Sequence, residues 1–369
     1  MYQEGHLGFR ELALLGFTVL AGVVVLPHPA LVAQQGITAG WAVALLSAVW
    51  AGILTLPIVS LMQDFPGRGL PEALQETFGL VPGLVANVAL TLWLVLKTAL
   101  GVRLVMETFA VAILPRTPPT AIGATVLAMA VYGAYLGLEP VARANVIVWP
   151  ALTLSVLAVA AAVLPEAHTD WLFPLAGPGL SGLVAASLRD IGLWADLGLT
   201  GVYAYAARSP GHLRAAAMWA LATSAIALAG TVALGTAVLG PEDAARHPFL
   251  FYRLARLVYL GRFFQRAEGL FVLFWIVGAL VYMAISLHAT ASLASVTLAL
   301  PYYRPLLFPL AVVAFSISLL PPDTITALRA DLAVRTWAVG PVFGVPILAY
   351  GLRLLRRKGV PAHAPTGDD

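Results

Sequence analysis

The chain has 369 residues, of which 60% are hydrophobic and 11% charged; soluble domains carry about 25% charged residues, so an integral membrane protein is predicted. The chain contains no cysteine, which excludes disulfides, thiolate catalysis and cysteine metal sites. A formal net charge of +3 is too small to indicate a nucleic-acid-binding protein.

The first predicted span runs from about Phe9 to Ala33 and holds Leu20-Ala21-Gly22 followed by Pro27-His28-Pro29. Glycine weakens a helix and proline removes a backbone donor, so this span is predicted to be interrupted. Irregular backbone at membrane depth persists only where protein or a cavity covers it. The interruption therefore predicts a site rather than a lipid-facing surface.

Eight further apolar stretches of spanning length are predicted around a central sixth one. Their approximate ranges are Ala39 to Met62, Leu80 to Leu114, Thr120 to Gly137, Asn145 to Leu164, Leu213 to Leu239, Glu268 to Leu298, Leu306 to Leu320 and Trp337 to Leu355. Leu70 to Phe78 predicts a short amphipathic helix, and Pro241 to Arg266 predicts a helix on or dipping into the membrane surface. A polar connection with Arg329, Asp331 and Arg335 is expected after Pro321.

The third span carries charge. Lys97 lies four residues after Trp93, on the same helical face. Two interpretations of Lys97 stay open. In the first, it faces a cavity and pairs with Asp196 or a ligand carboxylate. In the second, its role is structural: its charge is merely neutralised by a carboxylate, or its ammonium snorkels to the membrane surface. Arg103 and Glu107 are also four apart, and a structural ion pair is expected there.

The sixth span, Gly177 to Arg208, holds one cation, two carboxylates and glycines in its middle. Charged groups at that depth are costly unless paired, so they usually mark a site. Gly192 and Gly198 predict a second broken helix, and the alternative is an unbroken helix with Arg189 and Asp190 near one end. Because adjacent residues point apart, Arg189 and Asp190 are expected to find different partners in a buried network.

The two interrupted spans are the first and the sixth, five spans apart. Paired interruptions in inverted halves are typical of transporters with a midplane site. We therefore predict one transmembrane domain over 1–369, with ten helices in inverted repeats at about 9–164 and 177–355. The expected site lies between spans one and six, beside spans three, eight and ten, and suits an amino-acid zwitterion. Its predicted ligand-binding residues are Leu20, Ala21, Gly22, Trp93, Lys97, Gly192, Trp194, Asp196 and Tyr282.

No catalytic grouping, nucleotide loop or metal-ligand spacing is recognisable, so no enzyme, cofactor or metal is expected. His288, in the eighth span, is interpreted as a packing histidine rather than a proton relay. Lysine and arginine are more frequent on the side of the termini once the 241–266 stretch is excluded. That distribution predicts that both termini are cytoplasmic.

Several short motifs in a fixed order carry a family resemblance. They are Leu26-Pro27 with Gly40-Trp41, Arg103 and Glu107 with Leu114 to Pro118, Gly137 to Arg143, Pro174 with Gly177 to Leu180, Gln265 to Glu268 with Trp275, and Leu320 to Asp323. The chain resembles the B subunit of bacterial spore germinant receptors, the spore germination permease family of the amino acid–polyamine–organocation superfamily.

This resemblance implies a ten-helix fold of the leucine-transporter type in the inner membrane of the spore. It also implies A and C receptor subunits as partners and a nutrient, often an amino acid, as the ligand. Leu20-Ala21-Gly22 stands where the family has Gly-x-Gly. Three hypotheses follow: a germinant-receptor subunit, a proton-coupled amino-acid permease, and a structural membrane subunit with an empty cavity.

Overall fold

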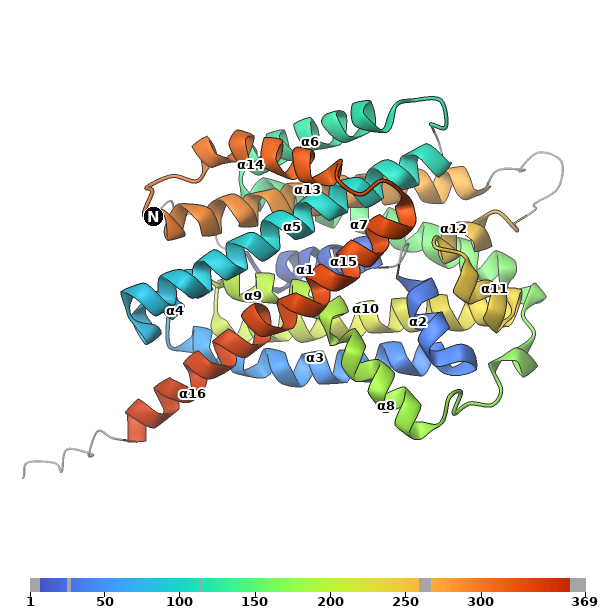
Figure 1. Cartoon of the computed structure of the whole chain (residues 1–369), viewed down its shortest axis with the longest axis horizontal. Coiled ribbons are helices and arrows are strands. Elements are labelled where there is room, and N and C mark those ends of the chain that lie inside the picture. The colour runs from blue at the N-terminus through green and yellow to red at the C-terminus, as the bar shows by residue number, and fades with distance from the viewer. Residues whose placement is uncertain (1–6, 25–27, 113, 259–266, 359–369) are drawn as a thin grey trace, which may run out of the picture.

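The computed structural model describes residues 7–24, 28–112, 114–258 and 267–358, which form a bundle of helices (Figure 1). A helix needs about 20 predominantly apolar residues to cross a bilayer. Seven helical stretches of the described chain meet this criterion by length and composition: Pro29–Gln63, Leu80–Ala110, Pro119–Leu136, Leu138–Glu166, Pro210–Leu239, Phe271–Thr297 and Thr324–Arg356. The chain is therefore an integral membrane protein, as its composition predicts.

The described residues of the first half form seven α-helices. They are α1 (Phe9–Val24), α2 (Pro29–Gly36), α3 (Gly40–Gln63), α4 (Leu70–Phe78), α5 (Leu80–Ala112), α6 (Pro119–Leu136) and α7 (Leu138–Val163). The predicted second and fourth spans and the short amphipathic helix are confirmed. The fifth span was expected from Asn145 but begins at Leu138. The predicted loop from Glu139 to Arg143 is helical, and these two residues form an ion pair four positions apart along α7.

The predicted first span contains two separate helices. α1 ends at Val24 and α2 begins at Pro29. Proline suits this first helical position because its missing N–H needs no partner there. Between them, residues 25–27, including Pro27, lie outside the described residues, whereas His28 is completely buried.

The predicted sixth span also changes its helical form. α8 (Leu180–Arg189) is followed by the 3₁₀ segment η4 (Asp190–Leu197) and by α9 (Gly198–Val202). Thus η4 holds Gly192, Trp194 and Asp196. Its tighter winding alters the direction of the side chains relative to an α-helix.

The part of the second half that the structure describes ends in a long composite helix. The elements are α10 (Pro210–Leu239), α11 (Pro241–Arg246), α12 (Leu250–Ala255), α13 (Ala267–Thr297), α14 (Arg304–Ser318), α15 (Thr324–Val339), the π-helical turn η6 (Gly340–Gly344) and α16 (Val345–Lys358). The predicted seventh, eighth and ninth spans correspond to α10, α13 and α14.

The tenth span begins earlier than expected. A polar connection was predicted through Arg335, but helix runs from Thr324 to Lys358. Asp331 and Arg335 are 1% and 2% exposed, respectively. They pair with each other four residues apart and with side chains of other helices, so neither charge is left uncompensated. The structure thus corrects the prediction of an exposed connection there.

The arginine-rich stretch after α10 also differs from expectation. Its described part forms two short helices, α11 and α12, rather than one surface helix. Leu250, Phe251 and Leu254 of α12 are buried, and α11 packs against α2. Residues 259–266 of that stretch lie outside the described residues.

The packing brings η4 and the end of α1 to the middle of the bundle. α1 packs against α10 and α7, and α13 packs against α5, α6 and α7. In Figure 1, α15 and α16 run diagonally across the bundle, and α15 packs against α5. α15 also contacts η4. These contacts place side chains from α5, η4 and α15 within reach of one another.

Helix α10 begins with a side-chain cap. The Ser209 hydroxyl accepts a hydrogen bond from the backbone N–H of His212 at 3.2 Å. We expect Ser209→Ala to lower the free energy of unfolding by about 1 kcal/mol, since an orphan donor loses its acceptor. Unfolding in mixed micelles measures this difference. Ser316→Ala is the control, because Ser316 is exposed and bonds only within α14; an equal loss in both variants would contradict the role of the cap.

Candidate functional site: a buried ion-pair cluster

Five buried side chains form one cluster, called here the ion-pair cluster: Lys97, Asp196, Asp331, Arg335 and His28. They come from α5, η4, α15 and the residue before α2. Each is at most 3% exposed. Lys97 of α5 forms a salt bridge with Asp196 of η4. Arg335 of α15 joins Asp196 to Asp331, at 3.4 Å and 2.7 Å. His28, just before α2, lies 2.9 Å from the same Asp331 oxygen.

The charges of the cluster balance. Lys97 and Arg335 offset Asp196 and Asp331 when His28 is neutral. Buried ions are tolerated at such depth only when they are paired and hydrogen-bonded. Arg335 also donates to the backbone carbonyl of Leu193 at 3.3 Å. The cluster therefore ties the 3₁₀ segment η4 to α5 and α15, two helices that are far apart in the sequence.

Two aromatic rings flank the Lys97 ammonium. Its Nζ lies 5.6 Å from the ring centroid of Trp93 and 4.9 Å from that of Tyr282. These distances are in the range of cation–π contacts. Trp93 and Tyr282 are both buried, on α5 and α13. Thus four predicted ligand-binding residues, Trp93, Lys97, Asp196 and Tyr282, lie together.

Gly192 in η4 and Gly198, the first residue of α9, allow this segment to approach its neighbours. A Cβ on Gly192 would lie 2.5 Å from the backbone oxygen of Arg335. A Cβ on Gly198 would lie 2.6 Å from Val342 and 3.6 Å from the Trp93 ring. These close approaches hold η4 against α15 and the η6 turn, which positions Asp196 toward Lys97.

The other predicted residues occupy different places. Leu20 lines a small pocket beside Asp196, whereas Ala21 lines a separate large groove. The indole N–H of Trp194 donates to Ser47 of α3 at 2.9 Å. Gly22 belongs to α1, but its surroundings are outside what the structure describes.

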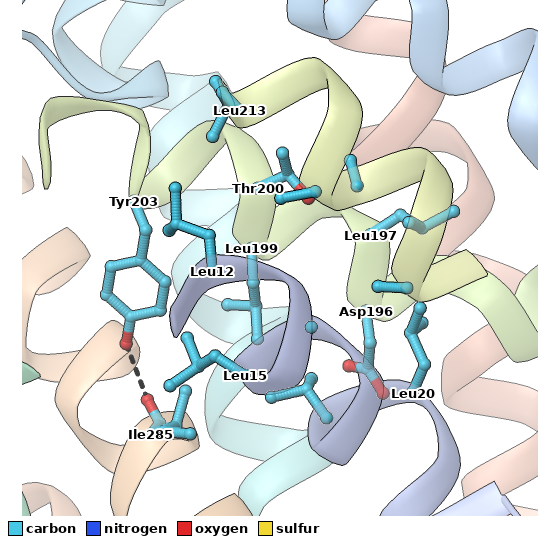
Figure 2. Close-up of a pocket in the computed structure, with 15 residues that line it drawn as sticks. Leu12, Leu15, Leu20, Asp196, Leu197, Leu199, Thr200, Tyr203, Leu213 and Ile285 are labelled. Atoms are coloured by element: carbon cyan, nitrogen blue, oxygen red, sulfur yellow. Dashed lines mark hydrogen bonds between the residues drawn. The ribbon is translucent and has the colours of Figure 1, made fainter. Parts of the chain in front are cut away.

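The pocket beside Asp196 has a volume of about 40 Å³. Figure 2 shows Asp196 next to Leu20 at one end and Tyr203, which donates to the Ile285 carbonyl at 2.8 Å, at the other. A volume of this size accommodates water, whereas ligand pockets are usually 300–1,000 Å³. The site is therefore closed in this conformation.

A second hollow, of about 860 Å³, is lined by α1, α7, α10 and α13. Phe17, Trp149 and Trp219 form an aromatic group on its wall, with centroids 5.8 to 6.5 Å apart. Exposed side chains such as Ile226 also line it, so it opens to the outer surface of the bundle. No member of the ion-pair cluster reaches this groove.

Other polar residues of the predicted spans form ion pairs or hydrogen bonds outside the cluster. Arg103 and Glu107 form a salt bridge at 2.7 Å, and Glu107 also accepts from the Thr324 hydroxyl. His288 is buried among tyrosines, within 3.2 Å of the Tyr203 hydroxyl.

Asp190 accepts a hydrogen bond from the Gln35 side chain at 2.8 Å. Arg189 is exposed, which corrects the expectation that it belongs to a buried network.

The sequence analysis missed three members of the cluster: His28, Asp331 and Arg335. Two signals were available. Asp331 and Arg335 are four residues apart, the spacing of an ion pair on one helical face. His28 lies between two prolines in the predicted interruption.

Known proteins resemble this chain in sequence and in fold. A family model described as "Spore germination protein" matches residues 6–325. The spore germination protein YndE of Bacillus subtilis (strain 168) is 28% identical over 167 residues, which cover 45% of this chain and 46% of YndE. The aligned part thus spans less than half the length of that relative.

The fold is similar to that of Mhp1, a nucleobase-cation-symport-1 family transporter, solved in a closed conformation with bromovinylhydantoin bound. The TM-score is 0.71, with 17% sequence identity, over 98% of this chain and 81% of Mhp1. At this identity the likeness establishes the fold only. Family and fold are those of a permease rather than of an enzyme, and the family predicted from the motifs is confirmed. This chain belongs to the spore germination protein family of membrane permeases.

Proposed function

We propose that this chain is the nutrient-sensing membrane subunit of a spore germinant receptor and binds a small, amino-acid-like solute at the ion-pair cluster. The observation that carries the proposal is the buried salt bridge between Lys97 of α5 and Asp196 of the 3₁₀ segment η4. Desolvated charges at membrane depth are functional by default. A solute with both charges is complementary to such a pair.

The proposed architecture has ten transmembrane helices in two inverted five-helix repeats, over about 9–164 and 177–355. Helices 1 and 6 would be the broken ones. Two observations support this arrangement: α1 and α2 are separate helices, and α8 is followed by the 3₁₀ segment η4 and then by α9. Helix ends at such interruptions provide N–H groups for a carboxylate and carbonyls for an ammonium. Leu20, Ala21, Gly22, Gly192 and Trp194 belong to these interrupted segments.

The proposed setting is the bacterial cell membrane or the inner membrane of the spore, with both termini cytoplasmic. The proposed partners are the A and C subunits of the germinant receptor and the surrounding bilayer. Family membership supports these partners. The distribution of loop lysine and arginine supports the orientation, although Arg335 is buried and does not contribute to that argument.

A proton-coupled amino-acid permease is the second candidate. It is favoured by the titratable Lys97 and Asp196 within the bundle, because intramembrane ionisable groups serve as proton carriers in many transporters. Uptake of labelled amino acids into proteoliposomes, with and without a pH gradient, separates the two functions. Gradient-driven uptake by the isolated chain supports the permease; specific binding without uptake supports the sensor.

Solute binding is tested by a thermal-shift screen of the purified full chain against the twenty amino acids. We expect at least one to raise the melting temperature, because a ligand that binds only the folded state stabilises it. Trp93→Ala and Asp196→Asn are expected to weaken that binding at least tenfold. Trp337→Ala is the matched control, since Trp337 is 44% exposed. Unchanged affinity in both cluster variants would place the site elsewhere.

A further inference from the structure

The Lys97 ammonium occupies surroundings that suit a ligand ammonium. The Asp196 carboxylate forms a salt bridge with it, and the rings of Trp93 and Tyr282 lie 5.6 Å and 4.9 Å from Nζ. Organic ammonium ligands are recognised by aromatic rings and a carboxylate arranged in this way. The protein's own side chain therefore fills an ammonium site, which we call the cage: Trp93, Tyr282 and Asp196.

Two hydrogen-bond donors at the cage, one on a cage residue and one on its neighbour Arg335, have no acceptor among the described residues. They are the Trp93 indole Nε1 and the Arg335 Nη2, and both are buried. Buried donors without acceptors are unfavourable, more so when charged. Both Asp196 and Asp331 already accept from Arg335. Donors without acceptors next to a filled ammonium site suit an incoming group rich in oxygen acceptors, such as a carboxylate.

We propose that a zwitterion enters by exchanging partners with the Lys97–Asp196 pair, an inference that rests on the proposed function. The ligand ammonium takes the place of Lys97 in the cage. The displaced Lys97, on its flexible four-carbon stem, pairs with the ligand carboxylate, which also accepts from Trp93 or Arg335. One buried ion pair becomes two, and no charge is left alone.

The exchange makes the site selective for zwitterions. A simple amine that displaced Lys97 would leave the lysine ammonium buried without a counter-charge. A simple carboxylate would add an anion while Lys97 still holds Asp196. An unpaired buried charge is strongly unfavourable, so neither is accepted. The exchange separates Lys97 from Asp196 and gives each a new partner of opposite charge. The site thus selects ligands by their net charge, whatever their side chain.

The room for this exchange arises only on opening. The space beside Asp196 is about 40 Å³ and is lined by Leu12, Leu15, Val19 and Leu20 of α1. These apolar side chains suit an aliphatic ligand (Figure 2). Movement of α1 away from η4 enlarges the pocket on the Asp196 side, which is where the ligand ammonium must arrive.

The test uses three matched probes: L-valine, isobutylammonium, which lacks its carboxylate, and 3-methylbutanoate, which lacks its ammonium. Binding to the purified full chain is measured by calorimetry. We expect the wild type to bind neither single-charge probe. Lys97→Ala empties the cage and is expected to bind isobutylammonium at least tenfold more tightly than the wild type. Asp196→Asn, in which Lys97 loses its counter-charge, is expected to gain 3-methylbutanoate instead.

Controls separate the cage from general effects of substitution. Lys97→Met fills the cage without charge and is expected to bind no isobutylammonium. Arg103→Ala removes a cation from the same helix and is expected to behave as the wild type. Asp196→Asn gives a second, independent result if Lys97→Ala does not yield folded protein. Folding of each variant is followed by size-exclusion chromatography.

The outcomes distinguish this inference from the proposed function. If no amino acid stabilises the wild type in the screen, solute sensing at this site is wrong. If the wild type binds an amino acid but Lys97→Ala gains no isobutylammonium and Asp196→Asn gains no carboxylate, the exchange is wrong. Equal binding of isobutylammonium by Lys97→Ala and by Lys97→Ala/Asp196→Asn would also overturn it, because the ammonium would then not be in the cage.

Discussion

Replacing Arg335 with methionine is expected to lower the free energy of unfolding by about 3–5 kcal/mol, the usual cost of breaking a buried ion pair by removing one partner. Arg335 is 2% exposed and bonds to Asp331, Asp196 and the Leu193 carbonyl. Methionine fills much of the space but supplies no donor. Two carboxylates would then share only Lys97 and His28.

Reversible unfolding in mixed detergent micelles measures this change. Arg329→Met is the matched control, because Arg329 is exposed on the same helix, α15. An exposed substitution usually changes stability by no more than about 0.5 kcal/mol. Similar losses for Arg329 and Arg335 would show that the cluster contributes little, and would contradict its role in holding η4 to α15.

Gly192→Ala is expected to lower the free energy of unfolding by about 1–3 kcal/mol, the range for overpacking a tight interior, and to weaken solute binding. The added methyl group would lie 2.5 Å from the Arg335 carbonyl oxygen, 2.7 Å from its carbonyl carbon and 3.0 Å from the Thr336 nitrogen. These are backbone atoms, so relief requires η4 or α15 to move. Movement of either separates Asp196 from Arg335.

Gly230→Ala is the control for this substitution. Gly230 is in α10, and a Cβ there meets nothing within 4 Å. Alanine is the better helix former by about 1 kcal/mol, so this variant is expected to be neutral or more stable. Thermal unfolding and the amino-acid binding assay are run on both variants. Equal behaviour of the two would mean that η4 and α15 are not closely coupled.

The sequence predicted much of the helical arrangement. Long apolar runs such as Leu80 to Leu114 and Glu268 to Leu298 correspond to α5 and α13, because a membrane span depends mainly on local hydropathy. Boundaries next to charged residues were less accurate. Glu139 and Arg143 were assigned to a loop, although an ion pair four residues apart is compatible with the first turns of α7.

The site was predicted only in part. Lys97 and Asp196 were recognised because a charge inside an apolar run is conspicuous. Asp331 and Arg335 were assigned to a polar connection, because two charges close together resemble a solvated segment. Only the packing of α15 against η4 and α5 makes them interior residues. Trp194, in contrast, uses its indole N–H to bond Ser47 and joins η4 to α3.

The sequence by itself determined the membrane class, the family and most of the helices, since these follow from local composition and from motif order. The tertiary structure decided which buried charges join into one cluster. Lys97, Asp196 and Arg335 are far apart in the chain, and each of these buried charges is stabilised by a counter-charge from another element. The spacing of Asp331 and Arg335 indicates one ion pair locally, and Lys97 with Asp196 was one of two open interpretations, but the joining of these pairs at one interior site depends on packing.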